Sequence, residues 1–253
     1  MTRMFKIVSI NLVVAICLAA LPAAVPAASS TNFPDSAVKL LVERELTRRG
    51  LAMNGMAVSV EDHVVTLSGS VASLAEKDKV GRAAHAAYAV KRVVNNLAVA
   101  ATIRDEEIAE AVRKSIVTHP NYDVFDWIDG EVNGANVKLY GFVREPWRKD
   151  EFEKRVQAIR GVVNIENQIE VLPLSNYDDR LRIAAVRLIY GNSTLSKYAL
   201  GANPSIHIVV DRGRVVLKGM VANSFDRQIA EAAVRGSLLA FDIKNELTVD
   251  TGL

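Results

Sequence analysis

The residue types that carry out most enzymatic chemistry occur in this chain without a catalytic or metal-ligating spacing. The four histidines are scattered over the sequence, at His63, His85, His119 and His207. The single cysteine, Cys17, lies in the apolar N-terminal segment, so no thiolate joins them in a metal site. The chain also has no G-x-S-x-G nucleophile motif. We therefore expect no enzymatic activity, no metal and no other cofactor.

Two pairs of carboxylates stand at helical spacing, Asp150 with Glu153 and Glu106 with Glu110. Such pairs serve general acid–base catalysis in many enzymes. Both pairs lie in segments rich in Arg and Lys, where ion pairs on a solvated helix face are the ordinary explanation. They do not change the expectation of a protein without catalytic activity.

Aromatic residues gather in the middle of the chain, and two basic residues follow the last of them. The group comprises Phe125, Trp127, Tyr140 and Trp147, followed by Arg148 and Lys149. Tryptophan and tyrosine beside cations suit a membrane interface, where one end of the side chain is apolar and the other is hydrated. Phe125 and Trp127 are equally consistent with the core of a small domain, so both interpretations stay open.

Arginines are enriched in two segments with helical periodicity. They are Arg44, Arg48 and Arg49 in the first segment and Arg180, Arg182 and Arg187 in the second. A positive charge close to an anionic membrane surface contributes about 1 kcal/mol to binding. These arginines, with Trp127, Trp147, Arg148 and Lys149, are therefore the candidates for lipid or partner binding. The neighbouring Glu43 and Glu45 favour the alternative of a solvated helix face.

A threefold repeat positions these residues. Residues 64–71, 136–143 and 214–221 align on Gly69, Gly141 and Gly219, with Val four residues before, Leu two before and Val two after each glycine. This alternation predicts a half-buried strand, and a valine nine residues before each glycine marks the partner strand of a hairpin. Asn95, Asn167 and Asn245 each fall 26 residues after their glycine in a third strand. The recurring glycines and asparagines are interpreted as structural positions.

Helices are predicted on both sides of each hairpin. Asp35, Asp105 and Asp178 each precede one apolar helical stripe and are expected to cap that helix. Start signals for the second helix are the Ser73/Glu76 capping box, Pro146, and Asn223 or Ser224. The segment from Asn192 to Pro204, with Tyr198 and Leu200, is a long connection that either binds a partner or serves as a spacer.

The predicted fold class is α+β, with three tandem α-β-β-α-β modules. Each module places two helices on one face of a small three-stranded mixed sheet, in which the last two strands run parallel. The expected boundaries are residues 35–100, 105–172 and 178–250. Because a module of this size is marginally stable alone and the connectors are short, the copies are expected to pack on one another.

Residues 1–28 have the order of basic, apolar and small-residue regions that is typical of a cleavable signal peptide. A retained membrane anchor is the alternative. Removal of Arg3 and Lys6 with this segment leaves 29 basic and 29 acidic residues, and zero net charge argues against nucleic-acid binding. Residues 103–173 have a net charge of −4, whereas residues 35–102 and residues 174–253 each have +2. Export without cysteine indicates the bacterial periplasm, with membrane association also possible.

The repeated unit, its V-x-L-x-G-x-V strand and its V-x-N-x-L-x-V strand resemble the BON domain family from Asp35 to Val249. The resemblance implies a non-catalytic module that binds phospholipid surfaces or envelope proteins and supports the bacterial envelope under osmotic or envelope stress. It implies no small-molecule substrate. The alternative function is a periplasmic protein-binding or holdase-like factor that uses apolar patches or sheet edges.

Overall fold

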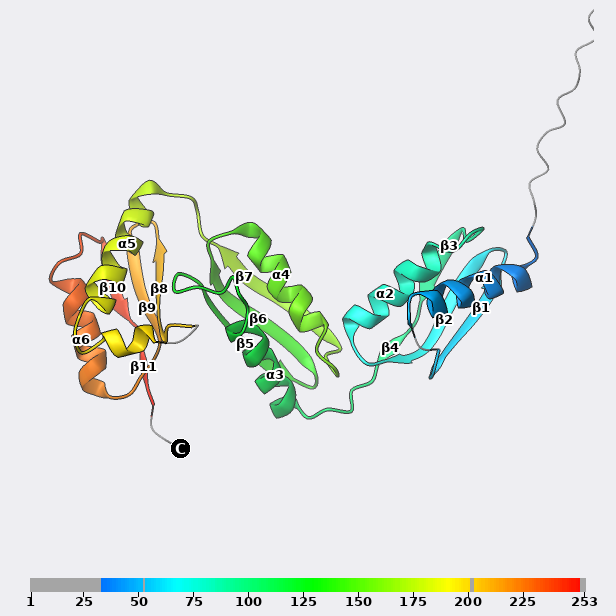
Figure 1. Cartoon of the computed structure of the whole chain (residues 1–253), viewed down its shortest axis with the longest axis horizontal. Helices are drawn as coiled ribbons and strands as arrows, with labels where there is room; N and C mark the ends of the chain where they lie inside the picture. Colours follow the sequence, from blue (N-terminus) through cyan, green and yellow to red (C-terminus); the bar gives the residue numbers. More distant parts are fainter. Residues whose placement is uncertain (1–32, 52, 201–202, 251–253) are drawn as a thin grey trace, which may run out of the picture. The chain divides into compact units, whose positions relative to one another are not determined.

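The structure is a computed structural model that describes residues 33–51, 53–200 and 203–250. The predicted signal peptide therefore lies outside the described residues. Three copies of one unit follow each other along the chain, and in each copy two helices cover one face of a small sheet (Figure 1). This arrangement confirms the predicted α+β fold of three α-β-β-α-β modules. Within the described ranges, no helix has the length and apolarity needed to cross a bilayer.

The first and third modules have a divided last strand, whereas that of the second is continuous. The first module contains α1 (Asp35–Arg48), β1 (Met56–Glu61), β2 (Val64–Val71), α2 (Leu74–His85), β3 (Arg92–Asn95) and β4 (Ala98–Val99). The second contains α3 (Asp105–Val117), β5 (Trp127–Asn133), β6 (Asn136–Val143), α4 (Pro146–Gln157) and β7 (Asn164–Val171). The third contains α5 (Asn176–Tyr190), η1 (Ser196–Ala199), β8 (Ile206–Asp211), β9 (Arg214–Val221), α6 (Ser224–Arg235), β10 (Asp242–Asn245) and β11 (Thr248–Val249).

Each sheet is built around the second strand of its hairpin. That strand pairs antiparallel with the first strand and parallel with the last, as β5-β6-β7 does in the second module. The alternating valines and leucines of this central strand point into the core, where Val137, Leu139 and Val143 are buried beneath Phe152 of α4. Burial of these side chains against the two helices therefore supplies most of the stability of each module.

The recurring glycines lie where the backbone of the partner strand leaves no room for a side chain. Gly69, Gly141 and Gly219 have φ angles of +109°, +125° and +111°. A Cβ atom at any of them would lie 2.0 Å from a backbone carbonyl oxygen at or just before the start of the partner strand, that of Gly55, Trp127 or Ser205. Only glycine fits, because any side chain combines this clash with an unfavourable backbone conformation.

The recurring asparagines fasten the last strand to the second helix. The side-chain amide N–H of Asn95, Asn167 and Asn245 donates to a helix carbonyl oxygen 18 residues earlier, at 2.8–3.2 Å. The side-chain oxygen accepts the backbone N–H two residues later in each copy. Each asparagine thus satisfies backbone groups where the strand bends past the helix.

One aspartate from the first helix holds the hairpin turn in each module. Each carboxylate accepts two turn N–H groups at 2.7–3.0 Å: Asp35 those of Asp62 and His63, Asp105 those of Gly134 and Ala135, and Asp178 those of Arg212 and Gly213. The prediction that these aspartates cap their helices is wrong, because the N-caps are Pro34, Arg104 and Ser175. All six turn residues have positive φ, and the carboxylate offsets the cost of this conformation.

Replacement of Gly141 by alanine should destabilise the protein by about 3 kcal/mol, because the added Cβ cannot coexist with the Trp127 carbonyl. Thermal unfolding followed by circular dichroism measures the effect. Gly134→Ala is the control, since its nearest neighbour would be 3.8 Å from the new Cβ at a φ of +56°. Equal losses for the two variants would contradict the steric role of Gly141.

Asp178→Asn should cost about 2 kcal/mol, because the amide NH₂ replaces an acceptor and faces a backbone N–H that then has no partner. Chemical denaturation with urea measures the free energy of unfolding. Asp150→Asn, on the exposed side of α4, is the control and should leave stability within about 0.5 kcal/mol of the wild-type value. A harmless Asp178→Asn substitution would show that the turn does not need the carboxylate.

Candidate binding surfaces

The opening helices of the first and third modules share an outward-facing pair of residues. In α1 the exposed Leu40 is followed one turn later by Arg44, and in α5 the exposed Ile183 is followed by Arg187. Leu40 and Ile183 are 67% and 50% exposed. The equivalent positions of α3 are Glu110 and Lys114, which are also exposed but carry no apolar side chain. Only the outer modules therefore present an apolar residue beside an unpaired arginine at this place.

Arg48 and Arg49 are exposed, as predicted for a basic surface, but both engage the same carboxylate. Glu45 accepts from Arg48 at 2.7–2.8 Å and from Arg49 at 2.7 Å. Hydrogen bonds from Arg48 and then Arg49 lower the pKa of Glu45 to about 2. Since one carboxylate pairs two guanidinium groups, this end of α1 keeps a net positive charge. Among the described ion pairs none involves Arg44.

Arg182 differs from its neighbours Arg180 and Arg187, which lie on the exposed face of α5. Its side chain is buried, where it donates to the carbonyl oxygen of Val210 and pairs with Asp179 at 2.7 Å. The guanidinium ties α5 to β8 instead of facing solvent. Arg182 is therefore removed from the residues that can contact a lipid surface directly.

The basic pair of the second module does not form the exposed patch expected from the sequence. Trp147 is 47% exposed at the start of α4, and the Arg148 guanidinium lies 5.5 Å from its ring centre. Arg148 itself is buried and forms ion pairs with Asp123 and Asp126. Lys149 is half-buried, and its backbone carbonyl accepts from Asn167. Trp147 is thus the accessible member of this group, and Arg148 serves the interior.

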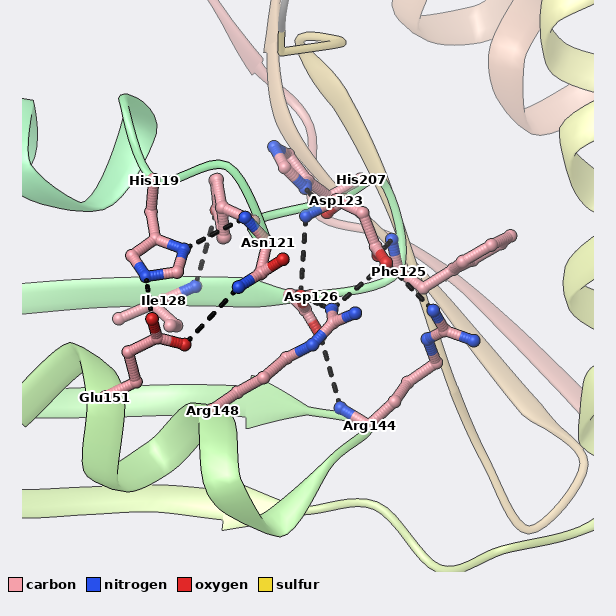
Figure 2. Close-up of polar contacts among 11 residues, drawn as sticks. His119, Asn121, Asp123, Phe125, Asp126, Ile128, Arg144, Arg148, Glu151 and His207 are labelled. Atoms are coloured by element: carbon pink, nitrogen blue, oxygen red, sulfur yellow. Dashed lines mark hydrogen bonds and ion pairs between the residues drawn. The ribbon is translucent and has the colours of Figure 1, made fainter.

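Asp126, which is fully buried, is the centre of a charged network in the second module (Figure 2). Arg148 pairs with both Asp126 and Asp123, while Arg144 pairs with Asp123 at 2.8 Å. The Arg144 backbone N–H donates to Asp126 at 3.2 Å. Burial, reinforced by the negative charge of Asp123, raises the pKa of Asp126 to about 6 against the opposing effect of Arg148.

The other members of the network respond differently to burial. Burial acts to raise the pKa of Asp123, but the Phe125 N–H and the guanidinium groups of Arg144 and Arg148 outweigh it and lower that pKa overall. Burial lowers the pKa of His207, whose Nδ1 lies 3.2 Å from the Asp123 carbonyl oxygen. The sequence pattern gives no sign of this network, which includes Asp123, Asp126 and Arg144. The reason is that the interacting side chains lie up to 25 residues apart in the chain.

The loop that carries this network also joins the second module to the third. The Ile208 N–H of β8 donates to the Val124 carbonyl at 2.7 Å, and Phe125 packs against the core of the third module. Trp127 stands edge-on to His207, with 5.4 Å between ring centres. The structure thus places Phe125 and Trp127 at the junction of the two modules, and neither belongs to the core of the second.

The junction also lines a cleft of about 790 Å³. Its walls are mostly apolar and include Trp127, Tyr140, His207 and Met220. Its charges occur with both signs, since Lys218 pairs with Glu246 at 2.6 Å, and Arg113 and Asp129 also line the cleft. This mixture selects no particular charge on a ligand.

The long segment between α5 and β8 is used mainly by its own module. Leu195 is buried in the core of the third module, and the Tyr198 hydroxyl bonds to Asp226 and accepts the Ala222 N–H at 2.8 Å. Asn203 reaches the second module, where its side-chain amide donates to the Val117 carbonyl at 2.5 Å. The described parts of this segment, residues 191–200 and 203–205, therefore contact both the third and the second module, with Leu200 exposed.

Raising the pH through 6 should destabilise the protein through Asp126. The folded chain binds this proton more tightly than the unfolded chain, whose aspartates titrate near 3.9, so the stabilisation is complete below pH 4 and is lost as the pH passes 6. Relative to wild type, Asp126→Asn should gain about 2 kcal/mol between pH 4.5 and 7.5 in urea unfolding. Asp129→Asn, an exposed control, should follow the wild-type slope. An identical slope for Asp126→Asn would refute the assignment.

Comparison with known proteins places the chain in a family. The BON domain matches residues 34–101, 104–173 and 193–251, the last match beginning after α5. The C-terminal domain of CdsD, the structural protein of the type III secretion system of Chlamydia trachomatis, is 12% identical over 86% of this chain and 100% of that chain, with a TM-score of 0.25. The PrgH periplasmic domain is 12% identical over 77% and 95% of the two chains, with a TM-score of 0.20. TM-scores this low do not establish a shared fold, and comparison with curated proteins finds no match. The three matches confirm the resemblance: the chain belongs to the BON domain family.

Proposed function

We propose that this chain is a non-enzymatic periplasmic protein that binds phospholipid surfaces and supports the bacterial envelope under osmotic or envelope stress. Membership of the BON domain family supports this proposal, since the family is associated with phospholipid binding. The observation that carries it is the exposed apolar residue beside an unpaired arginine on the opening helices of the two outer modules, Leu40 with Arg44 and Ile183 with Arg187.

The physical basis is local charge, since the chain without the predicted signal peptide is neutral overall. Ionic screening limits the reach of each charge to about 8–10 Å at physiological salt, so a membrane responds to the face that approaches it. On the exposed faces of α1 and α5, Arg44, Arg180 and Arg187 are available to phosphate groups. The adjacent Leu40 and Ile183 add apolar contact with the acyl region.

Two weak sites in one chain reinforce each other. A single arginine contributes about 1 kcal/mol near an anionic surface, which does not hold a protein on a membrane. When two modules of one chain bind the same vesicle, the second contact is intramolecular and the affinities combine. The acidic middle module, with Glu110 in place of the apolar residue, serves in this proposal as the connection between two binding modules.

Replacing Arg44 and Arg187 together by glutamine should weaken binding to anionic vesicles by about 2 kcal/mol, roughly thirtyfold. Co-sedimentation of residues 29–253 with phosphatidylcholine vesicles, with and without phosphatidylglycerol, at low and high salt measures the effect. Lys114→Gln is the matched control, because Lys114 occupies the same position on the opening helix of the middle module.

The two functional classes predict different results in this assay. Binding that requires phosphatidylglycerol, decreases at high salt and is insensitive to Lys114→Gln supports the membrane function. If the wild-type chain binds neither vesicle at low salt, the proposal is wrong. Salt-resistant capture of unfolded protein under the same conditions would then favour the holdase-like alternative.

A further inference from the structure

The third module exposes two large apolar side chains on the connection between α6 and β10. Leu239 is 86% exposed and Phe241 is 79% exposed, and we refer to these two residues as the tip. Neither contributes to the core of the third module, whose nearby members are Leu238 and Ile243. Exposed leucine and phenylalanine raise the free energy of the hydrated protein, so the fold itself gives no reason for them.

The backbone of the tip is held in place although its side chains project. The Phe241 N–H donates to the Gly213 carbonyl at 2.8 Å, and the Tyr177 hydroxyl donates to the Leu239 carbonyl. The Phe241 ring stacks on the Tyr177 ring with 5.7 Å between centres. Because the hairpin turn and α5 fix both ends of this connection, presenting the two side chains to a partner costs little conformational entropy.

The equivalent connection of the second module has a different use. Counting back from the recurring asparagine, Leu239 and Phe241 correspond to Gly161 and Val163. The Gly161 N–H donates to the Ala72 carbonyl of the first module at 3.0 Å, and Val163 packs against the core of its own module. The same end of the unit is therefore closed in the second module, whereas in the third it carries large apolar residues that face solvent.

The tip is continuous with the face of α5 that we propose to bind phospholipid. Tyr177 touches both tip residues, and the Arg180 guanidinium lies 5.9 Å from the centre of its ring. An aromatic ring and an arginine between an apolar end and a helix face match the composition of the membrane interface. Resting on the proposed function, we infer that Leu239 and Phe241 insert into the outer acyl region of an anionic phospholipid bilayer.

A bilayer fits this tip better than a folded partner does. The tip side chains protrude, because about four fifths of their surface is in contact with water. A protein partner would need a pocket shaped to them within an interface of about 800 Å² per side. Fluid acyl chains need no such complementarity. Charged residues of both signs flank the tip, Arg180, Arg212, Arg214 and Lys244 with Asp179, the half-buried Asp211 and Asp242. Insertion of the tip is therefore driven by apolar contact and should resist salt, in contrast to the helix-face arginines.

A single fluorescent probe tests the inference. Residues 29–253 contain no cysteine, so Leu239→Cys labelled with an environment-sensitive fluorophore reports on one site. With vesicles containing phosphatidylglycerol, we expect a blue shift and a severalfold increase in emission. Leu200→Cys, an exposed leucine outside the tip, is the matched control and should not respond. Leu239→Ser and Phe241→Ser should each weaken vesicle binding roughly tenfold at high salt without changing the thermal melt.

The outcomes separate the tip from the function on which it rests. Vesicle binding that persists with a silent probe at residue 239 and unchanged affinity of the serine variants would overturn the inference and leave the proposed function intact. A wild-type chain that binds no vesicle would overturn both. A probe signal that rises with protein concentration in the absence of lipid would identify the tip as a contact between copies of the chain and would also overturn the inference.

Discussion

The hairpin turn of each module passes through two consecutive residues in the left-handed region, and a carboxylate from the first helix stabilises this conformation. In the third module Arg212 and Gly213 turn the chain while Asp178 accepts both of their N–H groups. Turns of this hand match the twist of the flanking strands. Since the aspartate is near the start of the helix, the same contact also fixes the position of that helix over the sheet.

The arrangement of the rest of the module depends on these two hydrogen bonds between the turn and the aspartate. A fixed turn sets the register of the hairpin, which brings a glycine against a carbonyl oxygen at the other end of the strands, as Gly141 lies against Trp127. The central strand can then accept the last strand in parallel, and Asn167 ties that strand back to α4. Turn, glycine and asparagine therefore recur together, because each depends on the same register.

Burial decides which charges are available to a partner. Arg148 and Arg182 belong to basic segments, yet both are buried inside the protein. Arg148 pairs with Asp126, and Arg182 donates to the Val210 carbonyl oxygen. A buried guanidinium requires such partners because an unpaired buried charge is costly. Arg44 and Arg187, by contrast, are exposed beside Leu40 and Ile183 on the opening helices of the first and third modules. The middle module instead contributes its charged loop and aromatic residues to the junction with the third.

The sequence alone determined the repeated architecture, because alternation of apolar residues and invariant spacing record which side chains face a core. Gly69, Asn95 and their counterparts were recognisable as structural positions for the same reason. Tertiary structure decided what local pattern does not contain. Asp35 binds the N–H groups of a turn 27 residues away. Phe125 packs against the core of a neighbouring module. Whether an arginine such as Arg148 or Arg44 faces water depends on which carboxylates the fold brings to it, and those come from segments far apart in the chain.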